Sequence, residues 1–523
     1  MKLIFFLLLL RHLCAFKSST KGIDLLFSTI SELQIALESN WITSRDLVTW
    51  YLERIDEVNK DLRAVIETNP DALVIAKQLD SERKEKGARS PLHGIPVLVK
   101  DNIATADKMN TTAGSYALLG SRVPRDAGVI YRLRKAGAII LGKASMSEWA
   151  AFRSTNETRE GWSARGGMSA SAYIKDGDPC GSSSGSGIAA SIGLSAATLG
   201  TETDGSIVCP ASRASIVGLK PTVGLTSRAG VIPISHTQDS VGPMAQTVRD
   251  VALVLEIIQG IDPHDNATLD MDAVRPCNYT QFLLGSEGFK NMRLGVVRRG
   301  IFDNSSSVTV SQEQVNAAND AIKLMKKLGA HIQDPADIET IDEINRSAAE
   351  LTVLNTDFKQ DIKAYLSELT NTNIKTLADL IQFNREHQDV EFSKYMINQN
   401  QFEASENTTG YDSDEYIQAV ATSLRLGRKE GIDYTLDKYK LDALIMIGDG
   451  ASTASAIARY PIISVPLGYL TKQNGINEAL SGTPFGMLFT GRAWSEGTLL
   501  RLAHAFEQAT HIREKVRPQF APE

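Results

Sequence analysis

Apolar runs that are typical of buried strands stand on both sides of one long polar segment in this chain of 523 residues. Between about residues 92 and 245, runs such as GIPVLVK and AGAIILGK alternate with helical pieces. Residues 315–440 are polar and mostly helical in pattern, and three further strand-like runs follow them, LDALIMI, YPIISVPLGY and PFGMLFTG. Because strand-like runs flank the helical segment on both sides, we expect one sheet to include both groups of strands. This favours a single α/β domain over residues 20–523 with a helical layer, rather than two domains in series.

Helices are expected at both ends of this domain. Residues 28–66 have the pattern of two helices, and the second follows Thr43 and Asp46, which have the spacing of a capping pair. The stretch SEGTLLRLAHAFEQA predicts a last helix near the end of the chain.

The charge balance argues against nucleic acid or an anionic membrane as a general partner. The chain has 55 Lys and Arg residues against 62 Asp and Glu, a formal net charge of −7, and it contains no long basic run. Hydrophobic residues make up 42% of the chain and charged residues 22%, which is ordinary for a soluble globular protein.

The first 19 residues have the pattern of a secretory signal peptide. A lysine precedes the apolar run Leu3–Leu10, small residues follow it, and the run is too short to cross a bilayer. A frayed apolar tail is the alternative. Asn-x-Ser/Thr sequons occur downstream at Asn110, Asn156, Asn266, Asn278, Asn304, Asn345 and Asn407. Together these features predict a secreted, glycosylated product of the secretory pathway.

The cysteines do not form a disulfide framework. Cys14 leaves with the signal peptide, and Cys180, Cys209 and Cys277 remain, an odd number. One bridge plus a free thiol and three buried thiols both stay open.

The stretch CGSSSGSG, residues 180–187, opens an apolar or small-residue run, IAASIGLSAATLG, in which Ile188, Ile192 and Leu199 have helical spacing. We therefore expect a buried helix with the serines at its entrance, and not a flexible linker. A phosphate loop would need a Gly-Lys-Ser/Thr ending, which is missing. A nucleophile elbow at Ser183 would need a preceding strand, and YIKDGDPC makes a poor one.

A second serine turn and a lysine offer partners for this motif. Ser206 follows Gly205 in GTETDGS, 24 residues after Ser182, a separation that one helix and one strand span. Lys100 ends the strand-like run GIPVLVK. Such a lysine is usually solvated, but beside two serine turns it could be a buried base. The histidine that a Ser-His triad would need, His504, falls in the last helix.

With these residues the chain resembles the amidase signature enzymes, whose hallmark is a Ser–cis-Ser–Lys triad, and it looks closest to the peptide amidase branch and its fungal relatives. The resemblance covers about residues 28–510 and implies a large twisted mixed β-sheet with helices on both faces, with a signature core at about residues 92–250. The stretches that carry it are GIPVLVKDNI, TTAGS, LGKASMSEWA, CGSSSGSG, GTETDGSI, GLKPTVGLTSRAGVIPIS, DSVGPMAQTVRD, YPIISVPLGY and PFGMLFTGRAWSEGTLL.

The resemblance implies a role for each member of the triad: Ser206 is the nucleophile, Ser182 is the serine that follows a cis peptide bond with Gly181, and Lys100 is the base. A serine hydroxyl is a weak nucleophile that needs a base, and only a neutral lysine can accept its proton. Burial must therefore lower the pKa of Lys100 from its usual value of about 10.4 toward neutrality.

The turn TDGS is the expected oxyanion site, because the backbone N–H groups of Thr203, Asp204, Gly205 and Ser206 can converge on one point. Many family members have glycine where this chain has Asp204, so this side chain is expected to influence the choice of substrate. The pocket walls are expected from the helical layer and from residues near Ala150.

The expected function is hydrolysis of a small-molecule amide or a peptide C-terminal amide through an acyl-enzyme, with release of ammonia or an amine. No metal or cofactor is implied, since the sequence has no H-E-x-x-H motif and no Cys/His cluster. The amidase-like component of glutamyl-tRNA amidotransferase shares the motifs, but the signal peptide and the negative charge argue against that alternative. A kinase that uses a Ser/Gly loop would leave Lys100 and Ser206 without roles. The identity of the amide and the oligomeric state stay open.

Overall fold

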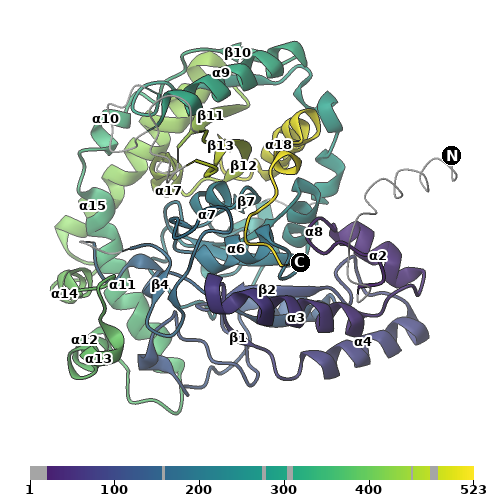
Figure 1. Ribbon diagram of the computed structural model, residues 1–523. Helices are drawn as coiled ribbons and strands as arrows, with labels where there is room; N and C mark the ends of the chain where they lie inside the picture. The colour runs from purple at the N-terminus through teal and green to yellow at the C-terminus, as the bar shows by residue number, and fades with distance from the viewer. Residues whose placement is uncertain are drawn as a thin grey trace, which may run out of the picture.

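The computed structural model describes residues 20–155, 159–273, 278–302, 310–448, 451–471 and 481–522. Among these residues, eleven strands form one mixed sheet in the order β1-β3-β2-β6-β8-β7-β12-β13-β11-β9-β10 (Figure 1). The strands are β1 (Val65–Thr68), β2 (Pro96–Lys100), β3 (Ile139–Ala144), β6 (Ala197–Glu202), β7 (Val217–Lys220), β8 (Ser240–Ala245), β9 (Arg293–Val296), β10 (His331–Gln333), β11 (Ala443–Ile447), β12 (Ile462–Tyr469) and β13 (Pro484–Thr490). A separate hairpin contains β4 (Trp162–Ser163) and β5 (Gly167–Met168).

The two groups of strands expected from the sequence meet where β7 pairs antiparallel with β12. On the N-terminal side of the sheet, β2 pairs in parallel with both β3 and β6, and β6 pairs antiparallel with β8. Because β2 and β6 run in the same direction, Lys100 and Glu202, the last residues of the two strands, lie at the same edge of the sheet. The expected mixed sheet is confirmed.

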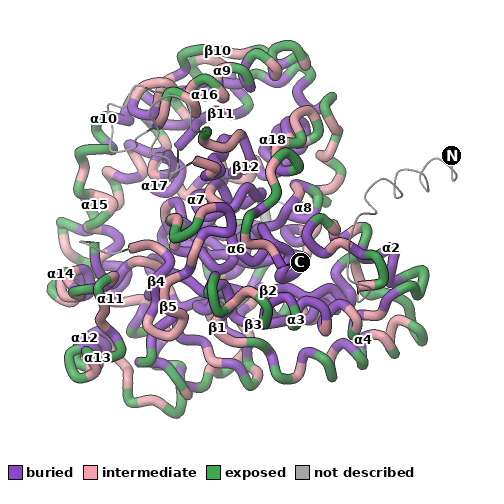
Figure 2. The backbone as a smooth tube through the Cα atoms, viewed as in Figure 1, coloured by how far each residue is buried: buried purple, intermediate pink, exposed green. Residues whose placement is uncertain are grey.

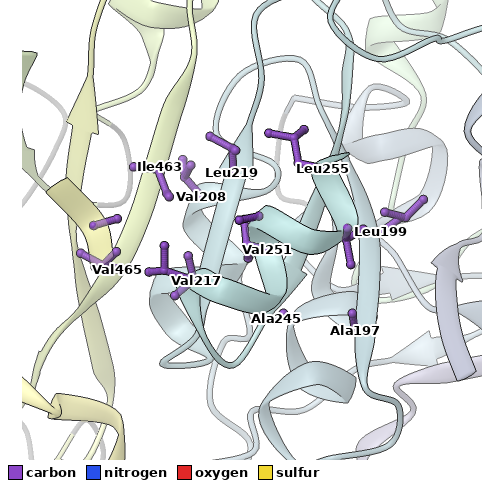
Figure 3. Packing of buried hydrophobic residues seen from close by; sticks show 14 of the residues in the cluster. Ala197, Leu199, Val208, Val217, Leu219, Ala245, Val251, Leu255, Ile463 and Val465 are labelled. Atoms are coloured by element: carbon purple, nitrogen blue, oxygen red, sulfur yellow. The ribbon is translucent and has the colours of Figure 1, made fainter. Parts of the chain in front are cut away.

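Helices cover both faces of this sheet. On one face α8 packs over β6, β7 and β8, and its Val251 belongs to the same buried cluster as Leu199 and Ala245 (Figure 3). Successive strand residues point to opposite faces, so Met244 points away from α8 and packs with Ala190 of α6. The helices are α2 (Ile30–Glu38), α3 (Ser44–Leu62), α4 (Ala72–Lys86), α5 (Gly128–Lys135), α6 (Ser184–Ser191), α7 (Val208–Arg213), α8 (Val248–Ile258), α9 (Gln312–Lys327), α10 (Ile341–Ile344), α11 (Ala349–Glu368), α12 (Leu377–Glu386), α13 (Gln388–Glu391), α14 (Asn400–Glu406), α15 (Asp414–Leu424), the π-helical η8 (Arg425–Ile432), α16 (Asp433–Tyr439), α17 (Thr453–Ala458) and α18 (Glu496–Thr510).

A second apolar cluster joins the helical layer to the loops around the sheet edge. Trp149, in the loop after β3, packs edge-on against Phe402 of α14 with the ring centroids 5.7 Å apart. Phe358 of α11 stacks on Phe402 at 5.1 Å. The central strands of the sheet and these contacts are buried, whereas the edge strand β10 and the outward sides of α4 and α12 are largely exposed (Figure 2). Within the span expected to be helical, His331–Gln333 form β10 at the edge of the sheet.

Most local expectations are confirmed. β2, β3, β11, β12 and β13 coincide with the strand-like runs, and α18 coincides with the last expected helix. α2 and α3 are the two helices expected near the N-terminus, and Thr43 and Asp46 form a capping box at the start of α3. A capping box satisfies backbone N–H groups that otherwise lack partners at a helix start, which is why this helix begins where it does.

One local expectation is wrong. The helix expected to run from Ile188 to Leu199 ends at Ser191, before Gly193, which has a φ of 66°. Ala197–Glu202 form β6 instead. Periodicity alone does not separate a buried helix from a buried strand in a short, wholly apolar run, and here pairing with β2 and β8 decides for a strand.

The expected signal peptide, residues 1–19, lies outside the described residues, as does Cys277. No helix among the described residues is both long and apolar enough to cross a membrane.

Candidate active site

Lys100 is fully buried at the end of β2. Its Nζ donates hydrogen bonds to Ser182 Oγ at 2.7 Å and to the carbonyl oxygen of Thr201 at 3.0 Å. Burial lowers the pKa of Lys100 to about 7, although the carboxylates of Glu160, Asp239 and Glu202 partly oppose this effect. A substantial fraction of the amine is therefore neutral, and able to accept a proton, near pH 7.

Ser182 lies in the loop that leads into α6, and the peptide bond between Gly181 and Ser182 is cis, as expected from the resemblance. Ser182 is fully buried, and its carbonyl oxygen accepts a hydrogen bond from Ser147 N at 3.0 Å. The next residue, Ser183, donates from its backbone N to the carbonyl oxygen of Ser206 at 3.2 Å. The two serine motifs therefore lie side by side, joined by a direct hydrogen bond.

Ser206 follows β6 in a tight turn in which Gly205 has a φ of 80°. Its side chain forms no hydrogen bond with the residues that the structure describes, and the residue is 9% exposed. Within the same described residues, the backbone N–H groups of Asp204, Gly205 and Ser206 have no hydrogen-bond partner either. A serine hydroxyl beside several free N–H donors is the arrangement that stabilises the oxyanion formed on a carbonyl oxygen when the hydroxyl attacks the carbonyl carbon.

Two buried carboxylates hold the ends of this turn. Glu202 Oε2 accepts hydrogen bonds from Ile207 N at 2.6 Å and Val208 N at 2.9 Å, the two amides that follow the nucleophile candidate. Asp239 Oδ1 accepts a hydrogen bond from Thr203 Oγ1 at 2.6 Å. The amides outside the turn are thus satisfied internally, which leaves those of the turn for a ligand.

Asp204 connects the turn to the C-terminal half of the chain. Its carboxylate accepts hydrogen bonds from Ser452 Oγ and from Thr453 Oγ1, the latter at 2.7 Å, at the start of α17. Burial raises the pKa of the Asp204 carboxyl, while the hydrogen bonds from Ser452 and Thr453 and the charge of Lys220 oppose this rise. The side chain is therefore engaged in structure, and the expectation that it faces the substrate directly stays a prediction.

Ala150 lines a cavity of about 10 Å³, room for a single water molecule, together with Thr203, Asn102 and Asp239. Trp149, Ala150 and the next residue, Ala151, all have positive φ, at 51°, 56° and 67°. Three consecutive non-glycine residues in this region are unusual and occur where surrounding contacts impose them. The structure thus places Ala150 beside the expected oxyanion turn.

A disulfide bond joins Cys180 to Cys209, with Cα atoms 5.9 Å apart. Cys180 directly precedes Gly181. Cys209 lies on α7, and its backbone N donates to the carbonyl oxygen of Gly205 at 2.8 Å. The bridge therefore ties the two serine motifs together, and it settles one of the pairings that the sequence left open.

The structure does not support a catalytic triad that contains Ser183 and His504. His504 lies on α18, and its Nδ1 accepts a hydrogen bond from Gly285 N at 3.1 Å. Ser183 Oγ donates to the Thr201 carbonyl oxygen at 3.1 Å, so both side chains are engaged with backbone groups and not with each other.

Among the described residues, one group has the composition of a cation site, His236 with Asp357 and Asp361, whose ligand atoms lie within 4.8 Å of one another. These atoms already have partners. His236 Nδ1 lies 3.0 Å from Asp361 Oδ2, Tyr416 donates to Asp357 Oδ1 at 2.7 Å, and Tyr411 donates to Asp361 Oδ1 at 2.9 Å. This network fits a structural link between α11, α15 and the loop before β8.

Comparison with known proteins decides the family. A family model described as Amidase matches residues 46–500. The chain belongs to the amidase family. A probable amidase of Arabidopsis thaliana is 44% identical over 492 residues, which cover 93% of this chain and 91% of that protein. The expected family is thus confirmed, and with it an amide-hydrolysing enzyme.

A solved structure and a more distant sequence relative support the same family. The X-ray structure of the native peptide amidase of Stenotrophomonas maltophilia is similar to this amidase with a TM-score of 0.86 at 38% identity, covering 95% of this chain and 99% of that one. A glutamyl-tRNA(Gln) amidotransferase component of Chloroflexus aurantiacus is 29% identical over 501 residues, covering 92% of this chain and 96% of that protein. The expected alternative is therefore the more distant relative.

Proposed function

We propose that this amidase hydrolyses amides through an acyl-enzyme on Ser206, with Lys100 as the base and Ser182 as the proton relay. The observation that carries the proposal is the 2.7 Å hydrogen bond between Lys100 Nζ and Ser182 Oγ in a fully buried setting. A buried lysine that makes no ion pair with a described carboxylate has a lowered pKa and can act as a base near neutral pH.

The first half of the reaction forms the ester. Ser206 Oγ attacks the amide carbon and gives its proton to Ser182, whose own proton passes to Lys100 Nζ. The negative charge that develops on the carbonyl oxygen is held by the N–H groups of the 204–206 turn. When the C–N bond breaks, the leaving nitrogen takes a proton from Ser182, which Lys100 replaces, so the base returns to its neutral form.

The second half releases the acid. Water attacks the ester carbon of the acyl-Ser206 group and loses a proton along the same relay, and Ser206 leaves with a proton from Ser182. A carboxylic acid and ammonia or an amine are the products. Every proton transfer in this scheme uses the two serines and the lysine.

The proposed substrates are small-molecule amides or the C-terminal amides of peptides. The likeness to a peptide amidase supports this class, and the net charge of −7 disfavours a charged-tRNA substrate. The test is a panel of peptide amides, aryl amides and fatty amides, with ammonia or amine release as the readout. Release from peptide amides supports the proposal, and activity confined to the transfer of amide nitrogen to a charged tRNA contradicts it.

We further propose that the chain enters the secretory pathway. The Cys180–Cys209 bridge supports this, because disulfides persist in oxidising compartments. Among the described sequons, Asn266, Asn278, Asn345 and Asn407 are exposed, whereas Asn110 is half-buried and donates from Nδ2 to the carboxylate of Glu67. Expression in a eukaryotic host tests the proposal: a shortened N-terminus and a mass loss on deglycosylation are expected, and an intact Met1 without a mass loss contradicts secretion.

A further inference from the structure

The carboxylate of Glu160, which the proposed mechanism does not use, lies against Gly181, the residue before Ser182. Glu160 Oε2 accepts a hydrogen bond from Ser147 Oγ, and Gly161 N donates to the same hydroxyl at 2.9 Å. A methyl group added at Gly181 would overlap both Glu160 Oε2 and Ser147 Oγ. The carboxylate, the hydroxyl and the glycine are therefore packed without free space, and this requires glycine at position 181.

Ser147 passes this contact on to the relay serine. Its side chain binds Glu160, while its backbone N donates to the carbonyl oxygen of Ser182 at 3.0 Å. Ser147 itself is 3% exposed. Ser147 therefore links the carboxylate of Glu160 to the carbonyl group of Ser182.

The same carboxylate acts on Lys100 through space. Lys100 Nζ donates only to Ser182 Oγ and to the Thr201 carbonyl oxygen among the described residues, so no carboxylate neutralises it by contact. Three carboxylates raise the pKa of Lys100 against the effect of burial, and Glu160 does so most strongly, ahead of Asp239 and Glu202.

The other two carboxylates are held by the catalytic turn. Glu202 accepts from Ile207 N and Val208 N, and Asp239 accepts from Thr203 Oγ1. Glu160 is the one that contacts the Ser182 loop. Its own pKa is raised by burial and by Asp178, and lowered by Ser147 and Lys100.

We propose that Glu160 is a positioning residue for the hydrolytic reaction: its carboxylate fixes the Ser182 loop through Ser147 and stabilises the positive charge that Lys100 gains when it takes the proton of the nucleophile. The inference rests on the proposed function of Lys100 as the base. Charge stabilisation of this kind favours acylation, because the lysine becomes cationic as the tetrahedral intermediate forms.

The test is the pH dependence of Ser206 reactivity in Glu160→Gln, measured as the rate of labelling by an alkyl fluorophosphonate, a probe that reacts with activated serines whatever the natural substrate. Loss of the negative charge makes the protonated lysine less stable. The rise in rate with pH should therefore begin at lower pH, by about one unit. The plateau rate should fall by about tenfold, because the lysine becomes a weaker base.

Two further variants separate charge from packing. Ser147→Ala keeps the Glu160 side chain and removes its hydrogen bond, so the plateau should fall while the midpoint of the pH profile shifts less than in Glu160→Gln. Glu53→Gln, an exposed change of the same kind on α3, should alter neither quantity. If Glu160→Gln does not fold, Glu160→Ser removes the charge without crowding the loop, and the same shift is expected.

The outcomes distinguish this inference from the proposal beneath it. A folded, active Glu160→Gln or Glu160→Ser enzyme with the wild-type pH midpoint overturns the role of Glu160 and leaves Lys100 as the base. A wild-type enzyme whose Ser206 does not react with the probe at any pH overturns the proposed function, and this inference with it.

Discussion

Lys100 Nζ lies 2.7 Å from Ser182 Oγ, and neither residue is exposed to solvent. The amine reaches Ser182 from β2, whereas Ser182 belongs to the loop before α6, 82 residues further along the chain. Because both side chains are shielded from bulk solvent, the charge on the amine depends on burial and on the surrounding carboxylates. The following predictions test what this arrangement does.

Replacing Lys100 by arginine should reduce the turnover number by at least about 100-fold. Arginine keeps the positive charge but does not lose its proton at accessible pH, so it cannot accept one from Ser182. The wild-type rate should rise as the pH increases through about 7, where Lys100 becomes neutral. Steady-state kinetics from pH 5 to pH 9 check both points. A Lys100→Arg enzyme whose turnover number is within a few-fold of wild type would rule out Lys100 as the base.

Replacing Ser206 by alanine should abolish hydrolysis and labelling by a fluorophosphonate, while the fold is retained. The hydroxyl makes no hydrogen bond to the described residues, so its loss removes the nucleophile without breaking a contact. Circular dichroism and ammonia release provide the measurements. Ser81→Ala, an exposed change of the same kind on α4, is the matched control, and substantial activity in Ser206→Ala would contradict the assignment.

Lys100 should cost the enzyme stability at low pH. Its pKa in the folded protein, about 7, is below the ordinary value of 10.5, so the folded state binds this proton less well than the unfolded chain does. The cost is complete below pH 7, shrinks between pH 7 and pH 10.5, and is absent above. The stability of Lys100→Met relative to wild type should therefore be greater at pH 6 than at pH 10.5, by about 4 kcal/mol.

Denaturant unfolding of both proteins at the two pH values measures this difference directly. Comparing the variant with wild type cancels the contributions of the other titrating groups. A gain that is the same at pH 6 and at pH 10.5 would show that the pKa of Lys100 is not lowered.

Asp204→Ala should lower the turnover number by about tenfold with little change in KM. The substitution removes the hydrogen bonds from Ser452 and Thr453 that fix the oxyanion turn. If the N–H groups of this turn are displaced, binding of the transition state is weakened more than binding of the substrate. Thr453→Val removes one of the two bonds at nearly constant volume and should give a smaller loss. A change confined to KM would instead indicate that Asp204 contacts the substrate.

Removal of the Cys180–Cys209 bridge should lower the free energy of unfolding by about 3–4 kcal/mol, the loss of loop constraint expected for a separation of 29 residues. Activity should fall as well, since Cys180 is next to the Gly181–Ser182 bond. The double variant Cys180→Ser, Cys209→Ser and reductant-treated wild type should behave alike in denaturant unfolding. Two free thiols at these positions in non-reduced wild type would refute the pairing.

The sequence predicted β2, β3, β11, β12 and β13 because these strands are largely buried and have continuous apolar runs, whereas β1 and β10 are short, partly exposed and without such a run. All five residues of β2 and of β11 are buried, and their limits follow the hydrophobic runs closely. The same property caused the error at Ile188–Leu199, where an apolar stretch contains a helix end and a strand. Only pairing with distant strands distinguishes the two.

The site was predictable to the extent that its residues belong to motifs. Lys100, Ser182 and Ser206 stand in the stretches that carry the family resemblance. Glu160 stands in a polar stretch, NETREGWSA, with no periodicity or spacing that indicates a role. Its importance depends on contact with Ser147, 13 residues away in the chain, which a single sequence does not encode in readable form.

The order of strands has a consequence for how activity is gained during folding. β2 and β6 are neighbours in the sheet although about a hundred residues separate them, and α17 meets the nucleophile turn from still further along the chain. Contacts of such large sequence separation tend to form late, after local helices and hairpins. On the proposed mechanism, partly folded chains of this enzyme therefore hold both serines without a working base, and amide cleavage begins only when the distant segments have joined.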